Sequence, residues 1–269
     1  MKKSLSLLGL VLVMILGLVA IGMVAEIQEE ELFSIKDPVG DDYGPGSYVY
    51  PTQGVFKPGT FDIVEVNVAE TDKSVIFKVK VNGAIDNPWG APNGFSVQMI
   101  HIYLDQDQQI GSGETKSIPG ANVVFTKESA WEKAIIAEGG WGTEVENYLS
   151  DEAPELAEKI HIAHSAWVDG QVINILVPKE FLGKFNSKWG IQVLMLSQEG
   201  SEETMDGIKI RRVVKAAESE WQFGGGDDSP VHPNVIDMLM PTNFDQAKIL
   251  SEYKTTNEYS VIPMVYPQK

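Results

Sequence analysis

The sequence feature that most constrains the fold is a regular alternation of apolar and polar side chains in two successive segments. In residues 61–69, valines at every second position alternate with Glu65 and Asn67. Residues 74–81 repeat this pattern, with lysines between the apolar positions. Since successive side chains of a strand point to opposite faces, each segment is predicted to be a strand with one buried face. The polar residues 70–73 between them predict a hairpin turn.

Other segments extend this into a sheet-rich chain. Residues 95–104 carry apolar side chains on both faces, which is typical of a central strand covered on both sides. Further strands are predicted at residues 160–168, 171–177 and 190–196, and short helices at residues 128–137, 153–158, 179–183 and 243–253. Many strands with a few short helices predict a mainly β fold, an antiparallel immunoglobulin-like or jelly-roll-like sandwich.

The beginning of the chain predicts export. Met1 and two lysines precede an uncharged apolar run that ends at Ala25. Residues 1–25 therefore have the charge and length of a signal peptide or of an N-terminal membrane anchor, and both interpretations stay open. We expect an acidic spacer over residues 26–33 and one β-domain over residues 34–269. The expected location is extracytoplasmic, either secreted or anchored to the outer face of the membrane.

Composition limits the partners. The formal net charge is −17, from 38 acidic and 21 basic residues. A surface this acidic repels nucleic acids and anionic lipids, so we expect no nucleic-acid partner. The chain contains no cysteine, so it has no disulfides despite its expected oxidising destination.

An unusual loop at residues 37–51 combines prolines and glycines with the carboxylates of Asp37, Asp41 and Asp42. Close carboxylates repel unless a cation or hydrogen-bond donors lie among them, which suggests a hard cation such as calcium. Asp105 begins a second acidic segment that could supply a ligand, although its spacing does not match a helix-loop-helix calcium loop. The alternative is a solvated turn cluster that precedes the first long strand.

Two tryptophans lie in glycine-rich loops rather than in predicted strands. Trp89 is flanked by Asn87 and Asn93, and Trp141 follows a pair of glycines. Indole faces bind the apolar faces of sugar rings, and amides can orient hydroxyl groups, so these four residues are the candidate carbohydrate site. The alternative is that the indoles anchor ordered loops.

Three motifs carry a resemblance to a known family. They are Asp37-Pro38-x-Gly40-Asp41-Asp42-x-Gly44-Pro45-Gly46-x-Tyr48-x-Tyr50-Pro51, then Asn87-Pro88-Trp89-Gly90 with Asn93-Gly94-Phe95, then Trp221-x-Phe223-Gly224-Gly225-Gly226-Asp227-Asp228 with Pro233-Asn234-Val235-Ile236-Asp237. In this order they resemble the C-terminal domain of glucodextranases, and more loosely the DOMON-like and family-nine carbohydrate-binding β-sandwiches. The resemblance implies a sandwich fold, binding to polysaccharide or to the cell surface, and a structural calcium ion.

The expected function is therefore an exported, non-catalytic module that binds a glucan or cell-envelope polysaccharide. The chain has no Gly-x-Ser-x-Gly and no His-Glu-x-x-His motif, so no enzyme is predicted. A different class stays open: a structural envelope protein that holds a partner, such as a surface enzyme, and has no sugar site.

Overall fold

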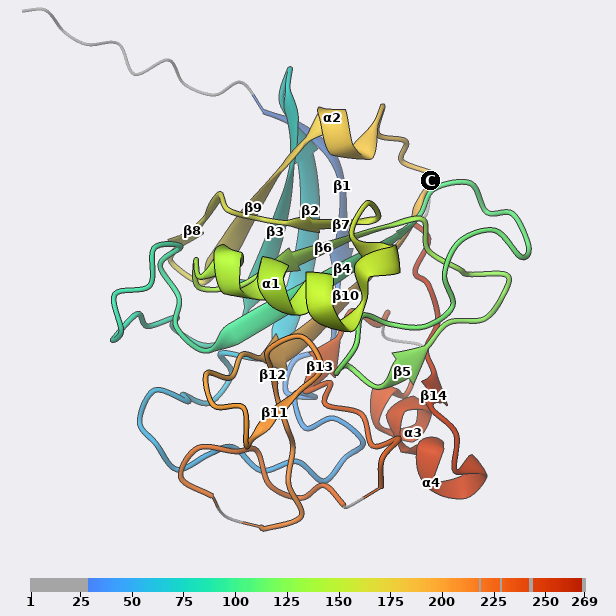
Figure 1. Ribbon diagram of the computed structural model, residues 1–269. Coiled ribbons are helices and arrows are strands. Elements are labelled where there is room, and N and C mark those ends of the chain that lie inside the picture. The colour runs from blue at the N-terminus through green and yellow to red at the C-terminus, as the bar shows by residue number, and fades with distance from the viewer. Residues whose placement is uncertain (1–28, 218, 228, 242–243, 268–269) are drawn as a thin grey trace, which may run out of the picture.

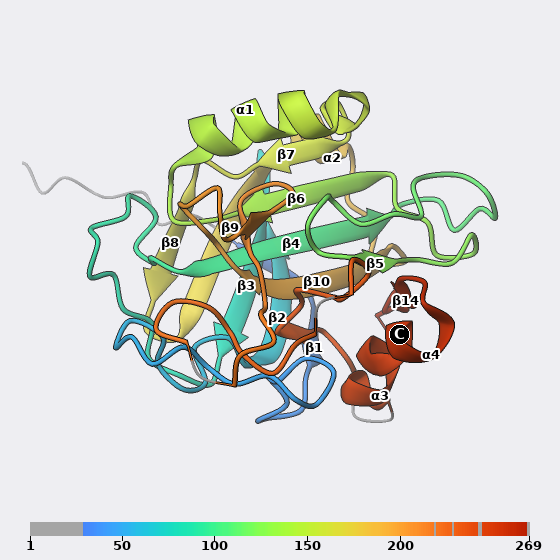
Figure 2. The ribbon, with the colours of Figure 1, turned by 60° about the horizontal axis from the view of Figure 1, so that its bottom comes forward.

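The computed structural model describes residues 29–217, 219–227, 229–241 and 244–267. Two five-stranded sheets pack face to face, and the views in Figures 1 and 2 show their strands crossing at a steep angle. The first sheet has the order β1-β2-β3-β9-β8: Glu30–Lys36, Ile63–Glu70, Ser74–Val81, Val172–Pro178 and Ala166–Asp169. The second has the order β13-β10-β4-β6-β7: Asp237–Met238, Gly190–Ser197, Gln98–Asp105, Lys133–Ala137 and Ile160–Ile162. The predicted β-sandwich is confirmed.

The first sheet follows the alternating pattern closely. β2 and β3 pair antiparallel, and their predicted hairpin is closed by a bond from the Thr71 N–H to the Ser74 carbonyl, 2.8 Å. β8 and β9 also form a hairpin, in which Gly170 has a φ of 60°. Residues Glu30–Phe33, expected as part of an acidic spacer, instead begin the edge strand β1. The predicted signal peptide or anchor at residues 1–25 lies outside the described residues.

The second sheet is buried on both faces. Every residue of β4 and β10 is buried, as predicted for a central strand from the double apolar pattern of residues 95–104. One face, which includes Ile102 and Val193, packs on the first sheet. The other face, which includes Met99 and Leu194, packs beneath α1 (Gly142–Glu152) through Val145. Figure 2 shows this helix lying across the outer side of the sheet.

The prediction of a helix at residues 128–137 is wrong, because residues Lys133–Ala137 form β6. This strand has four buried residues and pairs with β4, so tertiary burial outweighs the helical preference of its alanines. The chain then enters α1, which the sequence analysis did not predict, and returns as β7 parallel to β6. The helix predicted at residues 153–158 is a single turn, Pro154–Leu156.

Short elements complete the ends of the sandwich. They are α2 (Lys179–Leu182), α3 (Gln246–Ser251), α4 (Tyr253–Thr256), the pair β11 and β12 (Met205–Asp206 and Ile210–Arg211) and the parallel pair β5 and β14 (Val123–Val124 and Ser260–Val261). Below the sheets in Figure 1, the loop after β1 lies beside the segment after β12, and Val49 bridges to Gly224. Among the described residues, no helix is long and apolar enough to cross a membrane.

Candidate functional site

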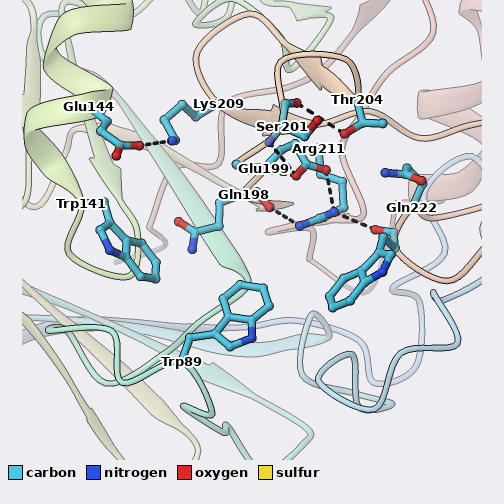
Figure 3. Close-up of a pocket in the computed structure, with 12 residues that line it drawn as sticks. Trp89, Trp141, Glu144, Gln198, Glu199, Ser201, Thr204, Lys209, Arg211 and Gln222 are labelled. Carbon is cyan, nitrogen blue, oxygen red and sulfur yellow. Dashed lines mark hydrogen bonds and ion pairs between the residues drawn. The ribbon is translucent and has the colours of Figure 1, made fainter.

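A pocket of about 630 Å³ opens where three loops meet, and it is called the indole pocket below. Its aromatic lining is Trp89, Trp141 and Trp221. Its charged lining consists of Glu144, Glu199, Lys209 and Arg211, and Gln198, Ser201, Thr204 and Gln222 add polar groups. Figure 3 shows Trp89 and Trp141 along one side, with the Glu199–Arg211 pair across from them. The structure therefore brings together the two tryptophans that the sequence analysis singled out.

Trp89 and Trp221 form an exposed aromatic ridge. Their ring centroids are 6.4 Å apart with an interplanar angle of 36°, and they are 45% and 37% exposed. Trp221 is held from behind by an edge contact with Phe56 at 6.3 Å. Exposed indoles that are fixed by packing offer rigid apolar faces to a ligand. The sequence analysis placed Trp221 within a motif but assigned it no binding role, because its partner Trp89 is far away in the sequence.

The asparagines do not line the indole pocket, because their amides build the loops that hold the indoles. The Asn87 amide donates to the Ala91 carbonyl, 2.8 Å, and accepts from the Ala91 N–H, 2.7 Å. Asn93 is 4% exposed and donates to the Glu138 carbonyl, 2.8 Å, while its own N–H donates to Gly139. These bonds tie the Trp89 loop to the segment that leads into Trp141.

Trp141 precedes the first turn of α1 at the end of a very tight loop. Gly140 has a φ of 112°, and a Cβ there would lie 2.7 Å from the Pro92 Cβ. Only glycine fits this backbone conformation and this contact without strain. The loop thus brings the Trp141 backbone close to the Trp89 loop, which explains the paired glycines seen in the sequence.

The floor of the indole pocket is a buried ion pair that the sequence analysis did not predict. Arg211 Nη1 lies 2.6 Å from Glu199 Oε2, and the two side chains are 4% and 8% exposed. The guanidinium also donates to the Ser197 hydroxyl at 3.1 Å and to the Gln198 and Trp221 carbonyls at 2.8 and 2.7 Å. Glu199 lies two residues beyond the end of β10, and Arg211 ends β12. A buried arginine in an acidic chain is the sequence signal that could have suggested such a pair.

A second ion pair neutralises the remaining charges of the lining. Lys209 Nζ binds the Glu144 carboxylate on the first turn of α1, and the lysine side chain is 9% exposed. Behind it, burial raises the pKa of Glu138, although the Trp141 and Gly140 N–H groups and the nearby Lys209 oppose this. The four charged lining residues form two opposite-charge pairs, so the indole pocket carries little net charge.

A smaller hollow of about 370 Å³ lies on the other side of the aromatic ridge. Trp89 and Trp221 line both hollows, and the second adds Gln53, Asp86 and Pro88. An extended ligand could therefore cross the ridge and contact both indoles.

A separate group of carboxylates is called the acidic cluster below: Asp37, Asp41, Asp62 and Asp237. Oxygen atoms of Asp37, Asp41 and Asp237 lie within 4.8 Å of one another. Burial raises the pKa of Asp37 to about 9, with further contributions from the charges of Asp41 and Asp62. Burial and neighbouring carboxylates also raise the pKa values of Asp41 and Asp62 to about 6 and that of Asp237 well above its ordinary range. The sequence analysis had predicted Asp37 and Asp41, together with Asp42, as metal ligands, and had not predicted Asp62 or Asp237.

The other two predicted metal ligands are Asp42 and Asp105. Asp42 lies beside the acidic cluster, where its charge contributes to the raised pKa values of Asp41 and Asp62, and its carboxylate accepts a hydrogen bond from the Tyr50 hydroxyl. Asp105 belongs to a second group with Asp107 and Glu132, whose oxygens also lie within 4.8 Å of one another. The Asp105 carboxylate already accepts from the Gln108 N–H, 2.7 Å, and the Tyr266 hydroxyl, 2.5 Å. The structure thus places Asp42 beside the acidic cluster and Asp105 in a separate acidic group.

Comparisons with known proteins agree with the motifs. No curated protein sequence matches the chain. The family described as the C-terminal, SLH-like binding module of glucodextranase matches residues 32–266. This match includes both sheets, all three motifs and every residue of the indole pocket. The chain therefore belongs to the family of glucodextranase C-terminal binding modules.

Proposed function

We propose that this chain is an exported, non-catalytic module that binds a neutral glycan, of the glucan or cell-envelope polysaccharide class, in the indole pocket. The observation that carries the proposal is the convergence of Trp89, Trp141 and Trp221 on one pocket. Two of these indoles are more than a third exposed although large apolar side chains are normally buried. Membership of a binding-module family supports the same conclusion.

The electrostatics of the indole pocket favour a neutral ligand. Arg211 is bonded to Glu199 and Lys209 to Glu144, so no lining charge is left over to pair with an ionic ligand. A sugar needs apolar contact for its ring faces and hydrogen bonds for its hydroxyls. The indoles supply the first, and Ser201, Thr204 and Gln222 supply polar groups elsewhere in the lining of the same pocket.

The aromatic ridge favours a chain over a single sugar. Since Trp89 and Trp221 each face hollows on both sides, consecutive sugar residues would contact the indole pocket, the ridge and the smaller hollow. This geometry suits attachment of the protein to a surface polysaccharide, because a site open on both sides can bind an internal segment of the polymer and needs no free polymer end.

Affinity electrophoresis tests the proposal. The purified protein is run in gels that contain a soluble α-glucan, pullulan or isolated envelope polysaccharide, beside the variants Trp89→Ala and Trp221→Ala. We expect at least one polymer to retard the parent protein and both variants to lose most of that retardation, because each loses a sugar-stacking face.

Trp167 offers a matched control. Its indole is 39% exposed, similar to Trp221, but it lies on β8 outside the indole pocket. Trp167→Ala should therefore keep full retardation. Equal loss in all three variants, or full retention by Trp89→Ala and Trp221→Ala, would contradict the assignment of the indole pocket. Unchanged melting temperatures would show that any loss comes from the missing ring and not from unfolding.

A further inference from the structure

None of the residues of the acidic cluster lines the indole pocket, and the cluster has no role in the proposed glycan binding. Its members come from three separate parts of the chain: the loop after β1, which holds Asp37 and Asp41, the segment before β2, and β13. The chain therefore brings together carboxylates that are up to two hundred residues apart in its sequence. Like charges gathered inside a protein oppose folding unless something compensates them.

Three oxygens of the acidic cluster have no hydrogen-bond partner among the described residues. They are Asp37 Oδ2, Asp41 Oδ1 and Asp62 Oδ1, and each atom is shielded from solvent. Asp37 and Asp62 are 5% and 1% exposed as whole residues. Unpaired buried carboxylate oxygens are costly, and native proteins rarely leave them without a partner.

The other oxygens are held in place by the backbone. Asp62 Oδ2 accepts from the Gly40 N–H at 2.9 Å and the Asn82 amide at 3.0 Å. Asp237 accepts from the Ile63 N–H at 2.6 Å and the Met238 N–H at 2.8 Å. The Met240 N–H donates to Asp37 Oδ1. Each of these carboxylates is thus oriented by donors, and Asp37 and Asp62 each keep one oxygen unpaired.

We propose that the acidic cluster binds one calcium ion, with Asp37, Asp41 and Asp237 as ligands and Asp62 as an additional carboxylate beside it. The ligand atoms are all carboxylate oxygens, from the loop after β1 and from the start of β13, with no histidine or cysteine in the group. Calcium prefers such hard oxygen donors and tolerates irregular geometry, whereas magnesium requires a stricter octahedron. The ion ties the loop that follows β1 to β13 and thereby closes one end of the sandwich.

Thermal unfolding and calorimetric titration of the full chain test the site after exhaustive chelation. We expect one equivalent of calcium to bind per chain. A calcium concentration of about 100 times Kd should raise Tm by about 5–10 °C. Magnesium at the same concentration should raise Tm by much less. Absence of any calcium-induced rise in the stripped protein would overturn the proposal.

Two matched variants locate the ion. Asp41→Asn should abolish both the binding heat and the calcium-induced rise in Tm. It should also raise the Tm of the stripped protein, because it removes one of the mutually repelling carboxylates; a merely misfolded variant would melt earlier instead. Asp107→Asn alters the second acidic group, Asp105 with Asp107 and Glu132, and should leave calcium binding unchanged. If Asp107→Asn loses the ion and Asp41→Asn keeps it, the proposed location is wrong.

Discussion

Replacement of Arg211 by methionine should be among the most destabilising single changes in this chain. The substitution keeps much of the aliphatic volume but removes a charge that is 4% exposed. Glu199 would then keep a buried carboxylate without its cation, and the Gln198 and Trp221 carbonyls would lose their donors. Breaking a buried pair by removal of one partner costs about 3–5 kcal/mol of unfolding free energy.

For a domain of this size, such a loss corresponds to a fall in Tm of about 6–20 °C. Differential scanning calorimetry of Arg211→Met gives the value directly. Arg212→Met is the matched control, because Arg212 is the next residue, is exposed, and its side chain donates one hydrogen bond, to the Met205 carbonyl at 3.0 Å. We expect its Tm to stay close to that of the parent protein.

The double variant Glu199→Gln with Arg211→Met separates the ion pair from packing. Because the double change removes both charges, it should cost less than the sum of the two single changes by about 0.5–3 kcal/mol. A cost below about 1 kcal/mol for Arg211→Met would refute the reasoning, since a buried pair must cost more when broken. Strict additivity of the two single changes would also refute it.

Three further predictions concern pH, loop support and ligand length. Burial lowers the pKa of His101 to about 3, so protons bind the unfolded chain more readily than the folded protein. The contribution of the neutral His101 to the free energy of unfolding is therefore fully present above pH 6.5. It is lost as the pH falls toward 3, by about 1.4 kcal/mol per pH unit. Chemical unfolding at pH 7 and pH 5 should therefore show a smaller acid loss in His101→Gln than in the parent; an equal loss would contradict this. Asn93→Ala should lower the free energy of unfolding by about 1–3 kcal/mol, because the buried Glu138 carbonyl loses its donor. The same change should weaken glycan retention. The control Asn186→Ala, at an exposed position, should change neither quantity. Calorimetry with an oligosaccharide series should show affinity rising until the ligand crosses the Trp89–Trp221 ridge; equal affinity for a monosaccharide and a long chain would exclude binding across it.

The sequence predicted the strands of the sandwich whose two faces differ in polarity, and also the strand whose two faces are both apolar. The alternation in β2 and β3 predicted their hairpin, and the two apolar faces of residues 95–104 predicted the central position of β4. β6 was not accessible, because Lys133, Ala134 and Ala137 are helix formers and only pairing with β4 makes the segment a strand. α1 was not predicted, because it begins with a glycine and few of its side chains are apolar.

The sequence predicted the candidate sites only in part, because tertiary structure brings some of their residues together. Trp89 and Trp141 could be singled out because each lies in a glycine-rich loop, where core packing does not require an indole. Asp62 and Asp237 are each flanked by apolar residues and have no acidic neighbour in the sequence that would mark them as metal ligands. They join Asp37 only through the topology of the sheets, which a local pattern does not contain.

The position of β13 has a consequence for the order in which the second sheet can assemble. β10 has β4 on one side and β13 on the other, and β13 begins at Asp237, far from β4 in the sequence. β14 follows still later and pairs with β5, more than a hundred residues earlier. Until β13 and β14 are in place, the second sheet keeps an open edge beside β10 and its outer apolar face is only partly covered. Pairings this distant in sequence form slowly, so we expect this part of the sandwich to be completed after the local hairpins.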